Sequence, residues 1–389
     1  MKHILKDLLL LTFLTLSTVF IVWFPFYLKL DNFLGLNFSS GIESIYRNFD
    51  GLEYIIISKS LYQPQIIAHL PQSLSANYYA AHFPGYALLI LLAAPFFGFL
   101  KSMLIISTLF TLGSVFAFYY LIKDFKLSSH PLLLSSNFLV LPARWLIVHS
   151  VGSAEPVFIF FTILTFYFFM KFEENKNFKF IWLTAFSGML AQFTRPPGIL
   201  IFITLVIFIL WKIFLLNKTK GFRRTISSLL PYSPIFFIPL TLLTIFYWYS
   251  LTYHDFFAYF HSGDNIHLTF PPFQVFNKDQ FWVGDIWLED IVYIFILGFL
   301  GGLTLIKQKL YPIAFFVLTY LTASTLIAHR DISRYILPIF PFVLIAFEKV
   351  LVSREFKVVL VIVALAIYLY AENFLISNTA PYPNLQLFN

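Results

Sequence analysis

The chain has 389 residues, of which 59% are hydrophobic and 12% charged, and its formal net charge at pH 7 is +7. Soluble globular proteins are about 45–50% apolar and about 25% charged, so this composition excludes an ordinary soluble protein and indicates a polytopic membrane protein. The lack of cysteine excludes disulfides, thiolate nucleophiles and Cys-ligated zinc. Basic residues of membrane proteins gather on the cytoplasmic side for topological reasons, so the charge predicts no nucleic-acid partner.

The first predicted element is an apolar stretch at residues 8–28, preceded by a short charged terminus. It is long enough to cross about 30 Å of hydrocarbon and has no small-residue cleavage site, so we expect a retained span with its amino end in the cytoplasm. Eleven further apolar segments follow at 84–100, 102–122, 131–149, 156–170, 180–194, 197–216, 229–250, 290–306, 311–328, 335–350 and 358–371.

The distribution of basic residues decides which of these segments cross the membrane. If all twelve crossed, the basic loop at 217–224 would lie outside, against the rule that Lys and Arg gather inside. Segment 84–100 has 17 residues, including Pro84, Gly85, Pro95 and Gly98, so we expect a re-entrant or juxtamembrane helix on the outer face. The prediction is therefore an all-α membrane protein with about 11 transmembrane helices and one domain over 1–389.

With this topology the two longest polar stretches, 29–83 and 251–289, become outer loops. The inner loops are short and mostly basic, and no glycine-rich phosphate loop follows a strand pattern, so a cytoplasmic nucleotide site lacks support. We therefore expect any chemistry to lie on the non-cytoplasmic face, with substrates delivered there. A lipid-linked substrate suits such a site.

Five short motifs in order resemble one family of membrane enzymes. They are Arg47-Asn48-Phe49-Asp50 followed by Tyr54, Ala81-His82-Phe83-Pro84-Gly85-Tyr86, Ser153-Ala154-Glu155-Pro156, Thr194-Arg195-Pro196-Pro197-Gly198 and Arg334-Tyr335-Ile336-Leu337-Pro338. This set resembles the PIG-V-type mannosyltransferases of the GT-C superfamily of integral membrane glycosyltransferases. The resemblance implies a GT-C-like fold and transfer of a hexose, most plausibly mannose, from a polyprenyl-phosphate carrier to an acceptor hydroxyl.

Asp50 is the candidate catalytic residue. Such a transfer needs a base that removes the proton of the acceptor hydroxyl, and a carboxylate at the start of a loop is suited to that role. The alternative is a helix cap, because Asp is a favoured N-cap residue and a helix is expected to begin near Gly51. The two roles are compatible. A single displacement with Asp50 as base would invert the anomeric carbon.

Further candidates for substrate binding are two carboxylates, Glu53 and Glu155, and the suggested partners of Glu155. Glu53 lies three residues after Asp50, on nearly the same helix face, although the same spacing also fits a capping box. Glu155 begins a predicted span, where a carboxylate is costly and indicates function, unless it is placed there by the helix dipole. His82 and Arg195 are its suggested partners, with an acceptor hydroxyl as a third possibility.

The lipid phosphate needs cationic partners, and the expected outer face has few. Arg195 lies at an outer turn, and His329, Arg330 and Arg334 form a second cluster. Arg presents a planar fork that matches phosphate oxygens, so we assign these residues to phosphate binding. The alternative for Arg330 or Arg334 is an ion pair with Asp331 or contact with lipid headgroups.

Loop 251–289 carries a set of possible metal ligands: His254, Asp255, His261, Asp264, His267, Asp279 and Asp285. Their spacing matches no common ligand pattern, so we expect a solvated loop, no metal site and no cofactor, with a divalent metal left open. The expected partners are a polyprenyl-phosphate sugar donor, a glycan, lipid or protein acceptor, and membrane lipids.

Two other classes of protein fit the composition. A multi-pass transporter or lipid flippase predicts charged residues near mid-membrane and related halves, and neither is visible here. A scaffold without catalysis leaves the gathering of Asp50, Glu155, Arg195 and Arg334 on one side unexplained. The convergence of these four side chains on one cavity distinguishes the enzyme from both.

Overall fold

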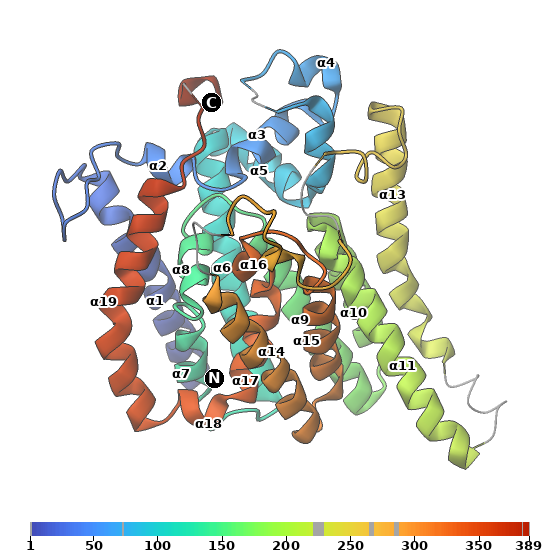
Figure 1. The fold of residues 1–389 in the computed structure, drawn as a ribbon. Coiled ribbons are helices and arrows are strands. Elements are labelled where there is room, and N and C mark those ends of the chain that lie inside the picture. The colour runs from blue at the N-terminus through green and yellow to red at the C-terminus, as the bar shows by residue number, and fades with distance from the viewer. Residues whose placement is uncertain are drawn as a thin grey trace. The chain divides into compact units, whose positions relative to one another are not determined.

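A computed structural model describes residues 2–71, 74–220, 229–263, 268–283, 288–382 and 384–388. Within these ranges all regular secondary structure is helical (Figure 1). The chain forms two compact units: unit 1 comprises Met1–Phe160, Ile245–Gly263 and Glu348–Asn389, and unit 2 comprises Phe161–Thr244 and Asp264–Phe347. The expectation of one domain over 1–389 stays a prediction.

Unit 1 contains the amino-terminal helices and the last long helix. Its elements are α1 (Lys2–Tyr27), α2 (Glu43–Tyr46), α3 (Gly51–Ser60), α4 (Pro64–Ile67), η1 (Ala76–Ala81), α5 (Pro84–Phe97), α6 (Phe99–Asp124), α7 (Pro131–Asn137), α8 (Ala143–His149), α18 (Glu348–Leu351), α19 (Arg354–Ser377) and η6 (Leu385–Phe388). The first residues of α9 (Glu155–Asn175) and the second half of α13 (Phe237–Thr252) also belong to it.

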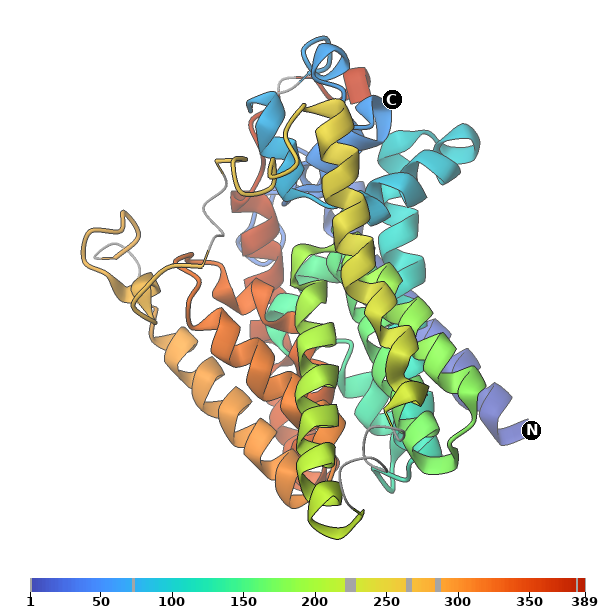
Figure 2. The same cartoon turned by 90° about the vertical axis from the view of Figure 1, so that its right-hand side faces the viewer.

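Unit 2 contains the rest of α9 and α13 and the helices between them and α18. These are α10 (Phe178–Thr194), η2 (Pro196–Gly198), α11 (Ile199–Lys220), η3 (Leu230–Phe236), η4 (Gln274–Phe276), α14 (Glu289–Lys307), α15 (Tyr311–Ser324), α16 (Ile332–Tyr335), η5 (Leu337–Ile339) and α17 (Phe340–Ala346). Helices α14 and α15 pack side by side and appear in orange tones in Figure 2.

Seven helical segments among the described residues are long and apolar enough to cross a membrane: Ile4–Tyr27, Phe99–Asp124, Glu155–Asn175, Pro196–Leu215, Leu230–Thr252, Glu289–Lys307 and Arg354–Ser377. Shorter apolar helices lie at Pro84–Phe97, Tyr311–Ser324 and Ile332–Ala346. Helices α1 and α19 leave large apolar side chains such as Phe13 and Val361 exposed, as lipid-facing helices do. The chain is an all-α, multi-pass membrane protein.

Two predicted segments differ from simple spans for reasons of backbone chemistry. Segment 131–149 is divided into α7 and α8, because Pro142, extended at φ −68° and ψ 164°, lacks an amide hydrogen and cannot continue α7. Helix α5 has 14 residues and is about 21 Å long at 1.5 Å per residue, too short for a full crossing. It ends at Gly98, whose φ of +75° suits glycine. The predicted helix near 84–100 is therefore present as a short apolar helix.

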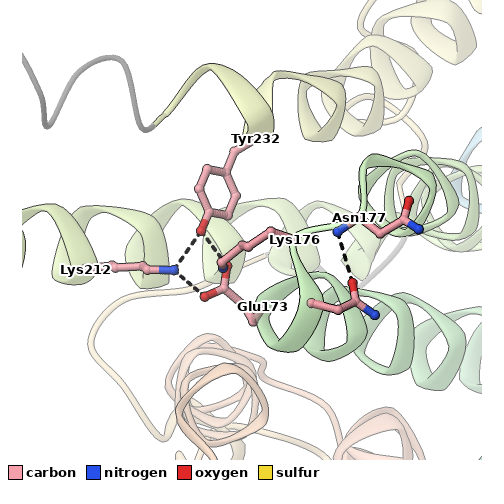
Figure 3. A network of polar contacts seen from close by, with 6 residues as sticks. Glu173, Lys176, Asn177, Lys212 and Tyr232 are labelled. Atoms are coloured by element: carbon pink, nitrogen blue, oxygen red, sulfur yellow. Dashed lines mark hydrogen bonds and ion pairs between the residues drawn. The ribbon is translucent and has the colours of Figure 1, made fainter.

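A polar network ties three elements of unit 2 together (Figure 3). Glu173 of α9 accepts hydrogen bonds from Lys212 of α11 and from Tyr232 of η3, and Lys212 also donates to the Tyr232 hydroxyl at 2.9 Å. Lys176 pairs with Glu173 at 2.9 Å. Burial of a charge is costly unless it is paired, so the network fixes these helix ends to one another.

Candidate functional site

Asp50 is the residue that immediately precedes α3. Its backbone (φ −90°, ψ 17°) leaves the helix, and its side chain makes no capping hydrogen bond to α3. The side chain is 33% exposed, and its Oδ2 atom lies 3.9 Å from Nε2 of His82, a distance of electrostatic contact that is too long for a hydrogen bond. The carboxylate is therefore directed toward His82 rather than used to cap the helix.

The first turn of α3 is held by a very close approach. A Cβ atom added at Gly51 would lie 2.9 Å from the backbone oxygen of Gly152 and 2.7 Å from Sδ of Met103. Only glycine fits this contact, which seats the start of α3 against α6 and the segment before α9. The position of Asp50 follows from it, because Asp50 is the neighbouring residue.

Tyr54 lies one helical turn after Asp50, and its backbone N–H donates to the Asp50 carbonyl at 3.1 Å. Its buried ring packs edge-on against His82, with centroids 5.3 Å apart, and against Tyr86 at 5.0 Å. The Asp-x-x-x-Tyr spacing thus places the Tyr54 ring against His82, the residue that lies beside the Asp50 carboxylate. The sequence predicted a helix that begins near Gly51, and the structure shows what Tyr54 of that helix contacts.

His82 follows η1 and is held on several sides. Its ring also packs against Tyr78, with centroids 5.4 Å apart, and its carbonyl accepts a hydrogen bond from the Tyr62 hydroxyl at 2.7 Å. Burial raises the pKa of Tyr62 well above its ordinary value, so this hydroxyl stays a donor. His82 is buried except for a small part of its side chain. Its ring contacts and the hydrogen bond to its carbonyl therefore fix the imidazole beside Asp50.

Glu53 is buried, with 8% of its surface exposed. Its Oε1 atom accepts a hydrogen bond from the Tyr382 hydroxyl at 3.1 Å. Burial, followed by the charge of Glu53, raises the pKa of Tyr79 above its ordinary value, which places that phenol near the same carboxylate. Glu53 therefore lies among phenolic hydroxyls. The Asp50 side chain makes no capping hydrogen bond to α3.

Glu155 is the first residue of α9 and is fully buried. It lies within electrostatic range of Tyr86, the ring that packs against Tyr54. The Tyr86 hydroxyl donates to the carbonyl of Met103 at 2.8 Å and lies 2.8 Å from Oγ of Ser107. Unit 1 therefore brings together Asp50, Glu53, His82 and, through Tyr86, Glu155.

The cationic candidates belong to unit 2. Arg195 is the C-cap of α10 in an extended conformation (φ −148°, ψ 145°), at the turn before η2. Arg334 is buried in α16, and the guanidinium carbon of Arg330 lies 5.6 Å from the centroid of the Phe281 ring. Their approach to the carboxylates of unit 1 stays a prediction.

His329 belongs to the same turn as the arginines. Its ring lies 5.2 Å from that of Tyr335 and 6.1 Å from that of Trp282, and its Nδ1 atom accepts the N–H of Asp331 at 3.0 Å. The ring is thus fixed by two aromatic neighbours and one backbone donor. His329, Arg330 and Arg334 thus belong to one turn, to which the two arginines contribute the positive charge.

The loop that carries the possible metal ligands is described in part. His261 donates from Nδ1 to the Asp255 carboxylate at 2.6 Å. Asp264, His267 and Asp285 lie outside the described residues. In the part of the chain that the structure covers, no three His, Asp or Glu side chains gather closely enough to hold a metal ion. The expectation of no metal and no cofactor stays a prediction.

Sequence reasoning missed the carboxyl-terminal residues that contact the Asp50 loop. Tyr382 reaches Glu53, and Phe374 packs on Phe49, with ring centroids 5.4 Å apart. The guanidinium carbon of Arg144 lies 4.2 Å from the centroid of the same Phe374 ring. No local signal in the sequence marks these contacts, because the partners are far apart in the chain.

Comparison with known proteins shows a shared fold. No protein-family model and no curated protein sequence matches the chain. The fold is similar to the crystal structure of ArnT from Cupriavidus metallidurans bound to undecaprenyl phosphate, with a TM-score of 0.56 and 13% sequence identity. The likeness covers 91% of this chain and 62% of the ArnT chain, so the protein spans less than two thirds of the length of ArnT. Together with the helical structure, it confirms the predicted fold class, an all-α multi-pass membrane protein.

Proposed function

We propose that this protein is a membrane glycosyltransferase that moves a hexose from a polyprenyl-phosphate carrier to an acceptor hydroxyl, with Asp50 as general base. The observation that carries the proposal is the one-third exposed carboxylate of Asp50 beside His82, at the start of a helix that no larger residue at position 51 would seat in the same way. The GT-C-like fold and the carrier phosphate bound to ArnT support the choice of donor.

The reaction is a single displacement. The acceptor oxygen attacks the anomeric carbon of the sugar, the bond from that carbon to the phosphate oxygen breaks, and the carrier leaves as polyprenyl phosphate. Asp50 takes the proton of the acceptor hydroxyl, and the anomeric carbon is inverted. General-base catalysis of this kind contributes about 10²–10⁴-fold in rate. The imidazole of His82, whose Nε2 atom lies 3.9 Å from Oδ2 of Asp50, borders the carboxylate that accepts the proton.

The buried carboxylates of unit 1 suit the binding of sugar or acceptor hydroxyls. Glu53 and Glu155 are hydrogen-bond acceptors in largely apolar surroundings, where each contact to a hydroxyl is strengthened by the low dielectric. The leaving phosphate requires cations, and we assign this role to Arg195, Arg330 and Arg334, whose guanidinium groups match phosphate oxygens. His329 supports the same turn.

The finer features of the proposal rest on the sequence. Mannose is favoured by the resemblance to the PIG-V-type family, and a position on the non-cytoplasmic face with a cytoplasmic amino terminus is favoured by the distribution of Lys and Arg. The acceptor is a glycan, a lipid or a protein hydroxyl.

The test is sugar transfer by the purified protein in lipid. Radiolabelled polyprenyl-phosphate mannose and polyprenyl-phosphate glucose are supplied in parallel, and release of label from the carrier is scored. We expect Asp50→Asn to lower kcat by about 10²–10⁴-fold, while the protein inserts and melts as wild type does.

The matched control is Asp31→Asn, an exposed carboxylate in the loop after α1. It should leave transfer unchanged. Wild-type transfer by a folded Asp50→Asn protein would remove the base from the proposal. Labelled carrier that crosses the membrane with its sugar attached would support a flippase instead.

A further inference from the structure

The loop that carries Asp50 has an unfavourable backbone. Phe49 adopts φ +51°, in the left-handed region that residues with a Cβ rarely occupy. Such conformations persist only where the surrounding structure determines them, and they cluster at functional sites. Something other than local preference must therefore hold the residue next to the proposed base.

The holding contacts come from the end of α19 and the residues that follow it. The fully buried side chain of Asn48 donates from Nδ2 to the carbonyls of Ser44 at 2.7 Å and Leu375 at 2.9 Å. Asn48 and Thr379 form an isolated antiparallel bridge, and the N–H of Ala380 donates to the Arg47 carbonyl at 2.8 Å. The backbone on the amino-terminal side of Phe49 is thus tied to the far end of the chain.

Side chains continue the same contact on both sides of Asp50. The rings of Phe49 and Phe374 pack with centroids 5.4 Å apart and an interplanar angle of 30°. Beyond Asp50, the Tyr382 hydroxyl donates to Glu53 at 3.1 Å, and the Tyr382 ring packs against Phe388. Figure 1 shows the red carboxyl-terminal segment passing beside α2 and α3.

We propose that this segment is a clamp that sets the position of Asp50 and Glu53 for the reaction. The clamp consists of Phe374, Leu375, Thr379, Ala380 and Tyr382. Its main partner in the Asp50 loop is Asn48. These are positioning residues, because they act through the Asp50 loop. The inference rests on the proposed role of Asp50 as base.

Hydrogen-bond geometry explains why the clamp is specific to this loop. An amide in the interior that donates to two carbonyls from different elements fixes their separation, and loss of either bond leaves a buried carbonyl unsatisfied. Asn48 joins α2 to α19 in this way, two residues before Asp50. Tyr382 fixes Glu53 three residues after Asp50. Asp50 is therefore held from both sides.

The experiment compares two buried asparagines. Asn48→Ala breaks the clamp, whereas Asn137→Ala removes a similar donor, whose Nδ2 bonds the carbonyl of Leu351 at 2.9 Å beyond the other end of α19. With labelled polyprenyl-phosphate mannose, we expect Asn48→Ala to lower kcat by about 10- to 100-fold, because a displacement of about 1 Å at a reacting group costs of order 10² in rate. KM for the polyprenyl-phosphate donor should change less than kcat, since the clamp positions Asp50 and Glu53 and not the arginines proposed to bind the carrier phosphate.

A second variant keeps the test decisive if Asn48→Ala folds poorly. Tyr382→Phe retains the ring that packs on Phe388 and removes only the hydroxyl on Glu53. It should lower kcat and speed amide hydrogen exchange in residues 47–54. Equal loss of kcat in Asn48→Ala and Asn137→Ala, or wild-type kcat in Tyr382→Phe, would overturn the clamp. An active Asp50→Asn protein would instead overturn the proposed function.

Discussion

Replacing Gly51 by alanine tests how tightly the start of α3 must be seated. The added Cβ atom would lie 2.9 Å from the Gly152 oxygen and 2.7 Å from Sδ of Met103, where ordinary contacts begin at 3.4 Å. Met103 is flexible, but the Gly152 oxygen is backbone, so α3 must shift by about 0.5 Å. Overpacking of this kind costs about 1–3 kcal/mol of stability.

The same shift predicts a loss of activity. A misplacement of about 1 Å costs of order 10² in rate. If the logarithm of the rate falls in proportion to the displacement, about 0.5 Å corresponds to a loss of roughly tenfold in kcat. The assay is transfer from labelled polyprenyl-phosphate mannose, with the melting temperature measured in the same lipid. The Gly51 contact is supported as the feature that positions Asp50 only if Gly51→Ala lowers kcat more than a variant that loses the same stability at another position.

The control for this variant is Gly113→Ala in α6. There the new Cβ atom would lie 3.0 Å from ring atoms of Phe160, a side chain that can move, and Asp50 is not adjacent. We expect a small loss of stability and unchanged kcat. Wild-type kcat in Gly51→Ala would refute the reasoning that the Gly51 contact fixes the position of the base.

Two further predictions concern charge. Glu173→Gln should lower the free energy of unfolding by about 2 kcal/mol, because hydrogen bonds to charged groups contribute about 1.5–3 kcal/mol and Lys212 loses its counter-charge. The control is Glu174→Gln at an exposed neighbouring position, which should melt as wild type does. Equal melting temperatures of the two variants would exclude the Glu173 network as a source of stability. The hydrogen bond from His261 holds the pKa of Asp255 below its ordinary value, so this contact stabilises the loop above about pH 4 and is lost as the pH falls through the lowered pKa. Amide hydrogen exchange of residues 255–261, corrected for intrinsic rates, should therefore accelerate as the pH falls through that range in the wild type and not in Asp255→Asn.

The long helices could be predicted from composition because a span needs about 20 apolar residues whatever they pack against. Segment 131–149 shows the limit of that reasoning. Its apolar content is continuous, but Pro142 ends the regular hydrogen bonding, and the segment folds as two short helices. The short helix α5 was predictable because segment 84–100 is short and contains prolines, and because a crossing there would place the basic loop 217–224 outside.

The candidate site was predictable only in its local part. The sequence predicts a helix that begins near Gly51, directly after Asp50, and the structure contains it. The capping preference of Asp suggested a hydrogen bond that is not made, since tertiary contacts of the Phe49 loop determine where the side chain points. The contacts of Tyr382 with Glu53 could not be predicted, because nothing in either segment indicates its partner.

The bond between Asn48 and Leu375 also has a consequence for how the protein is made. Its two residues are 327 positions apart, so at about 5–20 residues per second the ribosome completes the second about 16 to 65 s after the first. During that interval the first helices enter the bilayer while the Phe49 backbone lacks the partner that holds its left-handed conformation. In the newly made chain, the first spans can therefore enter the bilayer before the residues that hold the Phe49 loop have been translated.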